Sequence, residues 1–201
     1  QPIFPEGIRD DNSYIRSHGP PAKINPNHQV SILNKGAELN SLSPQQILEN
    51  PVSLIKCVRQ CAGQNRFSDS QAKGTPWVFA IAPVALSNPV SLKDVLFRAG
   101  VLEKDLSGNL IKITGSDGFS TTIDALKDDG YFYSLEGGKS LGVHHGGNVR
   151  FAVPGKYAYS WIKDVASVEL VPKKPSLKVQ QHLTLDQVQV LDYLIKMRWG
   201  T

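Results

Sequence analysis

The chain has 201 residues, of which 40% are hydrophobic and 20% are charged. This composition excludes a disordered or fibrous chain, and the length allows a sizeable buried core. The net charge of +4 comes from scattered lysines and arginines, which argues against nucleic-acid binding but suits a small anionic ligand. The longest apolar stretch, near residues 77–86, is interrupted by Pro83 and is too short to span a membrane.

The first quarter of the chain is predicted to be a loop, a strand and a short helix. Residues 1–28 are rich in Pro, Gly, Asn and Asp, which is typical of extended loop, and residues 29–33 form a strand candidate. Ser43 is a favourable helix N-cap, and Pro44 suits the first helical position. We expect this helix to end before Pro51, because proline disfavours helix at the residue before it.

The next segments are predicted to place a polar loop between two strands. Residues 52–58 alternate and predict a strand, whereas residues 60–73 are polar and predict a loop. Junctions between strands and loops commonly hold catalytic groups. Residues 76–86 are apolar with strand character, and Ser91 opens a short amphipathic helix that should end at Gly100.

The rest of the chain predicts further strands and one C-terminal helix. The strand candidates are residues 110–114, 131–135, 149–153 and 165–171, with residues 121–126 as a strand or a short helix. A Gly-Gly turn should follow residue 135, and the apolar spacing after Thr184 predicts an amphipathic helix. The pattern predicts a mixed α+β fold with many short strands. We expect a catalytic domain over residues 1–171, followed by a linker and helix over residues 172–201.

Two cysteines, Cys57 and Cys61, are present. From the residues alone they could be inert buried thiols or a disulfide, although a spacing of four is geometrically demanding in an extended segment. No Cys and His spacing supplies a convincing zinc site, and no C-x-x-C-H motif for c-type haem occurs. The position of Cys57 in the predicted strand favours a buried apolar thiol.

The segment R-Q-C-A-G-Q-N-R at residues 59–66 resembles the cysteine loop of sulfite oxidases and bacterial sulfite dehydrogenases, which reads about Q-C-[AS]-G-N-x-R. Gln64 stands where the family has Asn, but the interval from Cys61 to Arg66 is kept. Further resemblances follow in the family's order: Y-I-R-S-H-G-P at 14–20, K-G-T-P-W at 73–77, V-S-L-K-D-V-L-F-R-A-G at 90–100, H-H-G-G-N-V-R-F-A-V-P-G at 144–155 and S-W-I-K-D-V-A-S-V-E-L at 160–170.

The resemblance implies a sulfite-oxidase-type fold with a mixed β-sheet, and a molybdenum–molybdopterin cofactor held by Cys61 as the sole protein ligand. A thiolate is a soft, strongly donating ligand for such a metal. Arg59 and Arg66 would help to keep this thiol ionised. The alternative for Cys61 is a structural or disulfide-bonded cysteine.

The resemblance also implies roles for charged and aromatic residues around the cofactor. Arg16, Arg66 and Trp77 match substrate-pocket residues, and Arg binds oxyanions through forked, permanently charged donors. Without the motifs, surface salt bridges and core packing would be the ordinary roles of these residues. Positions that match the cofactor site, where the pterin phosphate needs cationic donors, are His18, Lys73, His145, Arg150 and Lys163, with His144 as a competitor of His145.

Two positions depart from the family pattern. Phe119 stands where the family has a tyrosine beside the metal, so the hydroxyl that assists coupled proton and electron transfer is missing. Asn148 replaces a family proline. These differences make sulfite itself a doubtful substrate. The competing functional hypothesis is a cofactor-free relative that acts as a binding or electron-transfer-complex subunit.

The resemblance finally implies a partner and a location. Nothing in these 201 residues matches the cytochrome domain that some relatives carry or the dimerisation domain that follows in many. We therefore expect a separate electron acceptor, such as a small cytochrome c. Because the chain begins at Gln1 and its one methionine is Met197, a removed export signal and a periplasmic location are expected.

Overall fold

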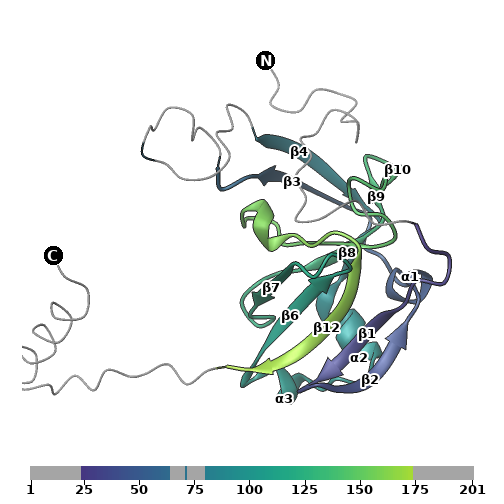
Figure 1. The fold of residues 1–201 in the computed structure, drawn as a ribbon, viewed down its shortest axis with the longest axis vertical. Coiled ribbons are helices and arrows are strands. Elements are labelled where there is room, and N and C mark those ends of the chain that lie inside the picture. Colours follow the sequence, from purple (N-terminus) through teal and green to yellow (C-terminus); the bar gives the residue numbers. More distant parts are fainter. Residues whose placement is uncertain (1–23, 64–70, 72–79, 174–201) are drawn as a thin grey trace, which may run out of the picture.

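The computed structural model describes residues 24–63, 71 and 80–173, which form three β-sheets and a few short helices (Figure 1). Within this part of the chain, no helix has the length and apolar character required to cross a lipid bilayer. The C-terminal helix predicted after Thr184 lies outside the described residues. So do most of the predicted N-terminal loop and most of the polar loop at residues 60–73.

The first sheet has five strands in the order β2-β1-β12-β6-β7. Strand β1 (Val30–Asn34) runs parallel to β12 (Val165–Pro172), which pairs antiparallel with β6 (Asn109–Gly115). These three strands confirm the sequence prediction, and β7 (Ser120–Ile123) shows that the ambiguous segment after residue 120 is a strand.

Strand β2 (Ala37–Leu42) was not predicted from the sequence. All of its residues but the last are exposed or half-buried, so it lacks the apolar alternation that marks a strand. Its pairing with β1 depends on the turn at Lys35 and Gly36, whose φ angles are 49° and 85°. Two left-handed residues in succession are typical of the tight turn that joins antiparallel strands.

The helices are short, and two of them begin at the predicted caps. Helix α1 (Pro44–Ile47) starts with a capping box, in which the Ser43 hydroxyl accepts from the Gln46 N–H and the Gln46 side chain accepts from the Ser43 N–H. Helix α2 (Leu92–Arg98) is capped by the Ser91 hydroxyl. Helix α3 (Glu103–Leu106) was not predicted.

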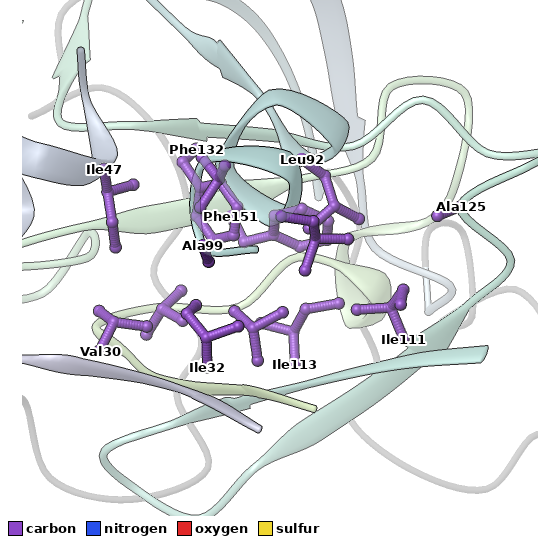
Figure 2. Packing of buried hydrophobic residues seen from close by; sticks show 14 of the residues in the cluster. Val30, Ile32, Ile47, Leu92, Ala99, Ile111, Ile113, Ala125, Phe132 and Phe151 are labelled. Carbon is purple, nitrogen blue, oxygen red and sulfur yellow. The ribbon is translucent and has the colours of Figure 1, made fainter. Parts of the chain in front are cut away.

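The main hydrophobic core lies on the first sheet (Figure 2). A row of fully buried side chains from β1 and β6 faces side chains of α1, α2 and the third sheet. Figure 2 shows the row Val30, Ile32, Ile113 and Ile111 opposite Ile47, Phe132, Phe151 and Leu92. Strand alternation supplies this row, because every second residue of a strand faces the same side.

The second sheet has the order β10-β9-β4-β3. Strand β3 (Leu54–Gln60) pairs antiparallel with β4 (Ile81–Ser87), and β4 also pairs with β9 (Leu135–Glu136). The predicted strand at residues 52–58 is therefore displaced by two residues. Strand β10 (Lys139–Ser140) follows β9 through Gly137 and Gly138, whose positive φ angles of 59° and 79° confirm the Gly-Gly turn.

The third sheet, β11-β8-β5, separates two cores. It contains β11 (Arg150–Ala152), β8 (Tyr131–Tyr133) and β5 (Val90–Ser91), and a 3-10 helix η3 (Ala158–Ser160) follows it along the chain. Phe132 and Phe151 pack in the main core, whereas Tyr133 and Ala152 pack with Val84, Leu86, Leu141 and Trp161 in a second core. Alternation along β8 and β11 therefore directs Arg150 and Tyr133 toward the second sheet.

Candidate active site

Cys61 lies at the end of the β3–β4 ladder. Its backbone N–H donates to the Ala80 carbonyl at 2.8 Å, one step beyond the last pair of the ladder, Gln60 with Ile81. The half-buried Sγ atom accepts a hydrogen bond from the Gly63 N–H at 3.4 Å. The thiol therefore lies one residue beyond strand β3, with an amide donor directed at its sulfur.

Cys57 lies on the same side of β3 as Cys61, because residues 57, 59 and 61 alternate with outward-facing positions. Both thiols are free, so the two cysteines do not form the disulfide left open by the sequence. Cys57 packs against the second core. Burial, together with the nearby Glu136 carboxylate, raises the pKa of its thiol to about 11. This position agrees with the prediction that Cys57 is a buried apolar thiol.

Arg59, between the two cysteines, is buried to 1% exposure. Its guanidinium donates from Nη1 to Glu136 Oε2 at 2.9 Å, and the Tyr133 hydroxyl donates to the same oxygen at 3.5 Å. Burial raises the pKa of the Tyr133 phenol well above its usual value, so the hydroxyl keeps its proton. The charge of Arg59, which the sequence suggested would help to ionise Cys61, is therefore shared with a buried carboxylate.

Trp161 connects this ion pair to a second buried arginine. The Arg59 guanidinium carbon lies 6.0 Å from the centroid of the Trp161 ring, and that of Arg150 lies 5.9 Å from the same ring. The indole N–H donates to the Val153 carbonyl at 3.0 Å, which fixes the ring in place. Cation–π contacts of this kind are stronger in a desolvated site than at a surface.

The segment at residues 144–148 holds the predicted cofactor residue His145 and its competitor His144. His145 is buried and His144 is exposed. The backbone carbonyls of both histidines accept hydrogen bonds from predicted cofactor residues: Arg150 donates to His145 at 2.7 Å, and Lys163 Nζ donates to His144. The structure thus brings His145, Arg150 and Lys163 together.

Glycine is required within this segment. Gly146 has a φ of 143°, and an added Cβ would lie 3.0 Å from Arg150 Cβ and 3.2 Å from a Leu141 methyl. Gly147 has a φ of 61°. The backbone therefore passes close over the Arg150 side chain in a conformation that other residues rarely adopt.

Asp164 ties this segment to β12. It is buried with a φ of 44°, and its Oδ1 accepts from Asn148 Nδ2 at 2.8 Å and from the Asn148 N–H at 3.4 Å. Its backbone N–H donates to Gly146 at 2.9 Å. A proline at position 148 would have no side-chain amide or N–H to donate. The asparagine that replaces the family proline therefore makes two hydrogen bonds to Asp164 that proline could not make.

Phe119 lies in the turn between β6 and β7, where its N–H donates to Asp117 Oδ1 at 3.0 Å. Its ring is half-buried and packs against the main core. The ring of Phe119, which stands where the resemblance has a tyrosine, therefore contributes to the packing of the main core.

Five predicted site residues lie outside the described part of the chain: Arg16, His18, Arg66, Lys73 and Trp77. Sequence reasoning did not identify Glu136, Trp161 or Asp164 as parts of the site. Because residue 59 faces the same side of the strand as the two cysteines, the sequence could have predicted that Arg59 is buried. It could not have predicted its partner Glu136, which lies 77 residues later in the chain. Among the described residues, no group of three or more His, Cys, Asp or Glu side chains is arranged to hold a metal ion.

Comparison with known proteins decides the family. The family model described as the oxidoreductase molybdopterin binding domain matches residues 18–178. The chain belongs to this family. It is 25% identical over 186 residues to the sulfite oxidase of Gallus gallus, an alignment that covers 84% of this chain and 40% of that protein.

A solved structure supports the same fold. The sulfane dehydrogenase SoxCD from Paracoccus pantotrophus superimposes with a TM-score of 0.68 at 20% identity, over 82% of this chain and 43% of that chain. The expected sulfite-oxidase-type fold is therefore confirmed. The chain spans less than half the length of either relative.

The described residues of this molybdopterin-binding domain suit the cofactor that the family implies. Cys61 offers one free, soft sulfur donor at the end of a strand, with the Gly63 N–H beside it. Arg150 and Lys163 bring cationic groups to the backbone around His145, as a phosphate-bearing cofactor requires. The chemistry of this donor set fits a thiolate-bound metal carried by an anionic pterin.

Proposed function

We propose that this chain is a molybdenum-dependent oxidoreductase that catalyses oxygen-atom transfer on a small substrate and passes two electrons to a separate acceptor protein. The observation that carries the proposal is the free thiol of Cys61, held at the end of the β3–β4 ladder inside the domain of a molybdopterin-binding family. The support for the cofactor is this family membership together with the donor set.

In this proposal, Cys61 binds the metal as its thiolate, and the Gly63 N–H stabilises the sulfur's negative charge. When bound, the molybdenum–pterin group supplies oxygen-atom transfer and stores the two electrons that result. The cofactor phosphate is bound by His145, Arg150 and Lys163 together with His18 and Lys73. Arg150 and Lys163 hold the backbone at residues 144–145, which supports a preformed position for this part of the site.

Substrate binding is assigned to Arg16, Arg66 and Trp77. The two guanidiniums would bind an oxyanion through paired hydrogen bonds, and the indole N–H would add a third donor. Phe119 provides no proton-transfer group, so a substrate whose reaction needs a hydroxyl at that position is disfavoured. This favours a small substrate other than sulfite.

The acceptor and the location follow from the resemblance. We propose a small cytochrome c as the electron acceptor and the periplasm as the compartment.

The proposal is tested by metal analysis of three proteins purified from a molybdenum-replete host: the wild type, Cys61→Ser and the matched control Cys57→Ser. We expect close to one molybdenum per chain in the wild type and in Cys57→Ser, with little in Cys61→Ser, because oxygen donates less charge to the metal than sulfur. Cys61→Ser should also lose turnover. A wild type that carries no molybdenum or pterin would support the cofactor-free binding subunit instead.

A further inference from the structure

The buried ion pair of Arg59 and Glu136 lies two residues from the proposed metal ligand. Arg59 is among the largest fully buried side chains of the described residues, and Glu136 is buried to the same degree, at 1% exposure. The resemblance gives Glu136 no role, and for Arg59 the sequence suggested only that its charge helps to ionise Cys61. A charged pair at this depth next to Cys61 therefore needs its own explanation.

The pair joins two strands that are not neighbours. The order of the second sheet is β10-β9-β4-β3, so β4 lies between the strand of Arg59 and the strand of Glu136. Arg59 is opposite Ala82 of β4, a small residue over which the long side chain can extend. The ion pair thus links the Cys61 end of β3 to the β9–β10 hairpin in addition to the ladder hydrogen bonds.

The same arginine also links Cys61 to the other side of the site. Arg59 and Arg150 both lie about 6 Å from the Trp161 ring, at 6.0 and 5.9 Å, and Arg150 donates to the His145 carbonyl at 2.7 Å. A continuous set of contacts therefore runs from the strand of Cys61 through Arg59, Trp161 and Arg150 to His145. The two ends of this set are the groups proposed to bind the metal and the pterin.

Stability alone does not account for such a pair. Burying two charges costs desolvation, and well-packed apolar residues of similar volume commonly stabilise a core as well or better. What a hydrogen-bonded ion pair provides in addition is direction, because the guanidinium and the carboxylate have few favourable relative orientations. Apolar side chains can slide past one another with a smaller penalty.

We propose that the Arg59–Glu136 pair is a positioning device that sets where the Cys61 sulfur lies relative to His145 and the cofactor. Its role is the placement of the sulfur, since the carboxylate of Glu136 offsets the charge of the arginine. This inference rests on the proposed function, in which Cys61 is the metal ligand. Arg59 is a positioning residue and does not touch the reacting atoms.

The test uses the full-length chain with Arg59→Met and Glu136→Met combined, which replaces both charges by apolar side chains of similar length. Removing one partner alone would leave an unpaired buried charge and would destabilise the fold, so the double variant is the informative one. Arg59→Lys is the conservative companion, because it keeps the charge but loses the forked geometry. Tryptophan fluorescence during urea unfolding establishes that each variant is folded.

The first readout is the alkylation of Cys61 by iodoacetamide in cofactor-free protein, followed by peptide mass mapping, with the rate in the wild-type protein as the reference. We expect Cys61 to react about tenfold faster in the double variant, because a loosened strand end opens more often. The second readout is the molybdenum content of the loaded protein, which should fall by about half or more, with Arg59→Lys intermediate in both measurements.

Wild-type alkylation and wild-type molybdenum content in the folded double variant would overturn the proposal and reduce the pair to core packing. If the double variant does not fold, Arg59→Lys decides the question alone, and a wild-type alkylation rate of Cys61 in that variant would overturn it. A wild-type chain that binds no molybdenum would refute the proposed function, whereas the alkylation comparison would still decide whether the pair positions Cys61.

Discussion

Asp164 offers a sharp test of how the segment at residues 144–148 is held. Replacing Asp164 with Ala removes the oxygen that accepts from Asn148 Nδ2 at 2.8 Å and from its N–H at 3.4 Å. A hydrogen bond to a charged group contributes about 1.5–3 kcal/mol, and the longer contact adds little. Alanine must also adopt the φ of 44°, which aspartate tolerates better, at a further cost of about 1 kcal/mol.

The expected loss in the free energy of unfolding for Asp164→Ala is therefore about 2–4 kcal/mol. Two control variants separate the contributions. Asp164→Asn keeps an acceptor and tolerates the left-handed backbone, so it should lose only about 1 kcal/mol. Asp164→Gly loses the acceptor but removes the backbone penalty, so its stability should lie between those of the other two variants.

Urea unfolding at neutral pH, followed by tryptophan fluorescence, measures these differences as shifts in midpoint at constant slope. Because the lost side-chain contacts to Asn148 hold the segment that contains His145, the alanine variant should bind less molybdenum as well. An alanine variant as stable as the wild type, or a glycine variant less stable than the alanine one, would show that Asp164 does not hold the segment in the way described.

Three further changes have defined outcomes. Burial raises the pKa of Cys57 to about 11, so this thiol contributes stability below about pH 8.5 that is lost as the pH rises toward 11. Relative to Cys57→Ala, the free energy of unfolding of the wild type should fall by on the order of 1 kcal/mol over that range, allowing for partial exposure. Parallel curves of unfolding free energy against pH for the two proteins would contradict this. Gly130→Ala should lower the free energy of unfolding by about 1–3 kcal/mol, because the added Cβ would lie 2.4 Å from Phe151 Cζ; an unchanged urea midpoint would exclude the clash. Phe119→Tyr should leave sulfite oxidation weak if the natural substrate is larger or less charged than sulfite, whereas a gain in kcat of about a hundredfold would show that the missing hydroxyl limits a sulfite enzyme.

Local signals explain the parts of the fold that the sequence predicts. Ser43 and Ser91 cap their helices as expected, because capping depends only on residues within one turn. Strands β6 and β12 were readable from apolar alternation. Strand β2 was not, because its residues are mostly exposed and its pairing is set by the turn at Gly36.

Long-range pairing limits what the sequence can predict. Residues 131–135 read as one strand, yet Tyr133 ends β8 in the third sheet and Leu135 begins β9 in the second. Alternation describes the exposure of a strand but not the identity of its partner. The ion pair of Arg59 is a similar case, since its carboxylate partner, Glu136, lies in the β9–β10 hairpin, far from Arg59 in the sequence.

In the candidate site, too, local patterns predict individual residues but not the long-range contacts between them. The cysteine-loop pattern predicts Cys61 as the metal ligand, and the later segment predicts His145 and Arg150 as cofactor residues. The contacts between them through Trp161 depend on how three sheets pack, which no local pattern encodes. Asp164 was missed because its function depends on a backbone conformation and on Asn148 sixteen residues earlier.

X-ray absorption at the molybdenum edge tests the central claim most directly, because it counts the sulfur atoms bound to the metal. It should be applied to the wild-type protein and to Cys61→Ser, reconstituted with cofactor where the variant does not retain it. The proposed role of Cys61 predicts one sulfur neighbour fewer in the variant than in the wild type. The same number of sulfur neighbours in both proteins would contradict the claim that Cys61 binds the metal.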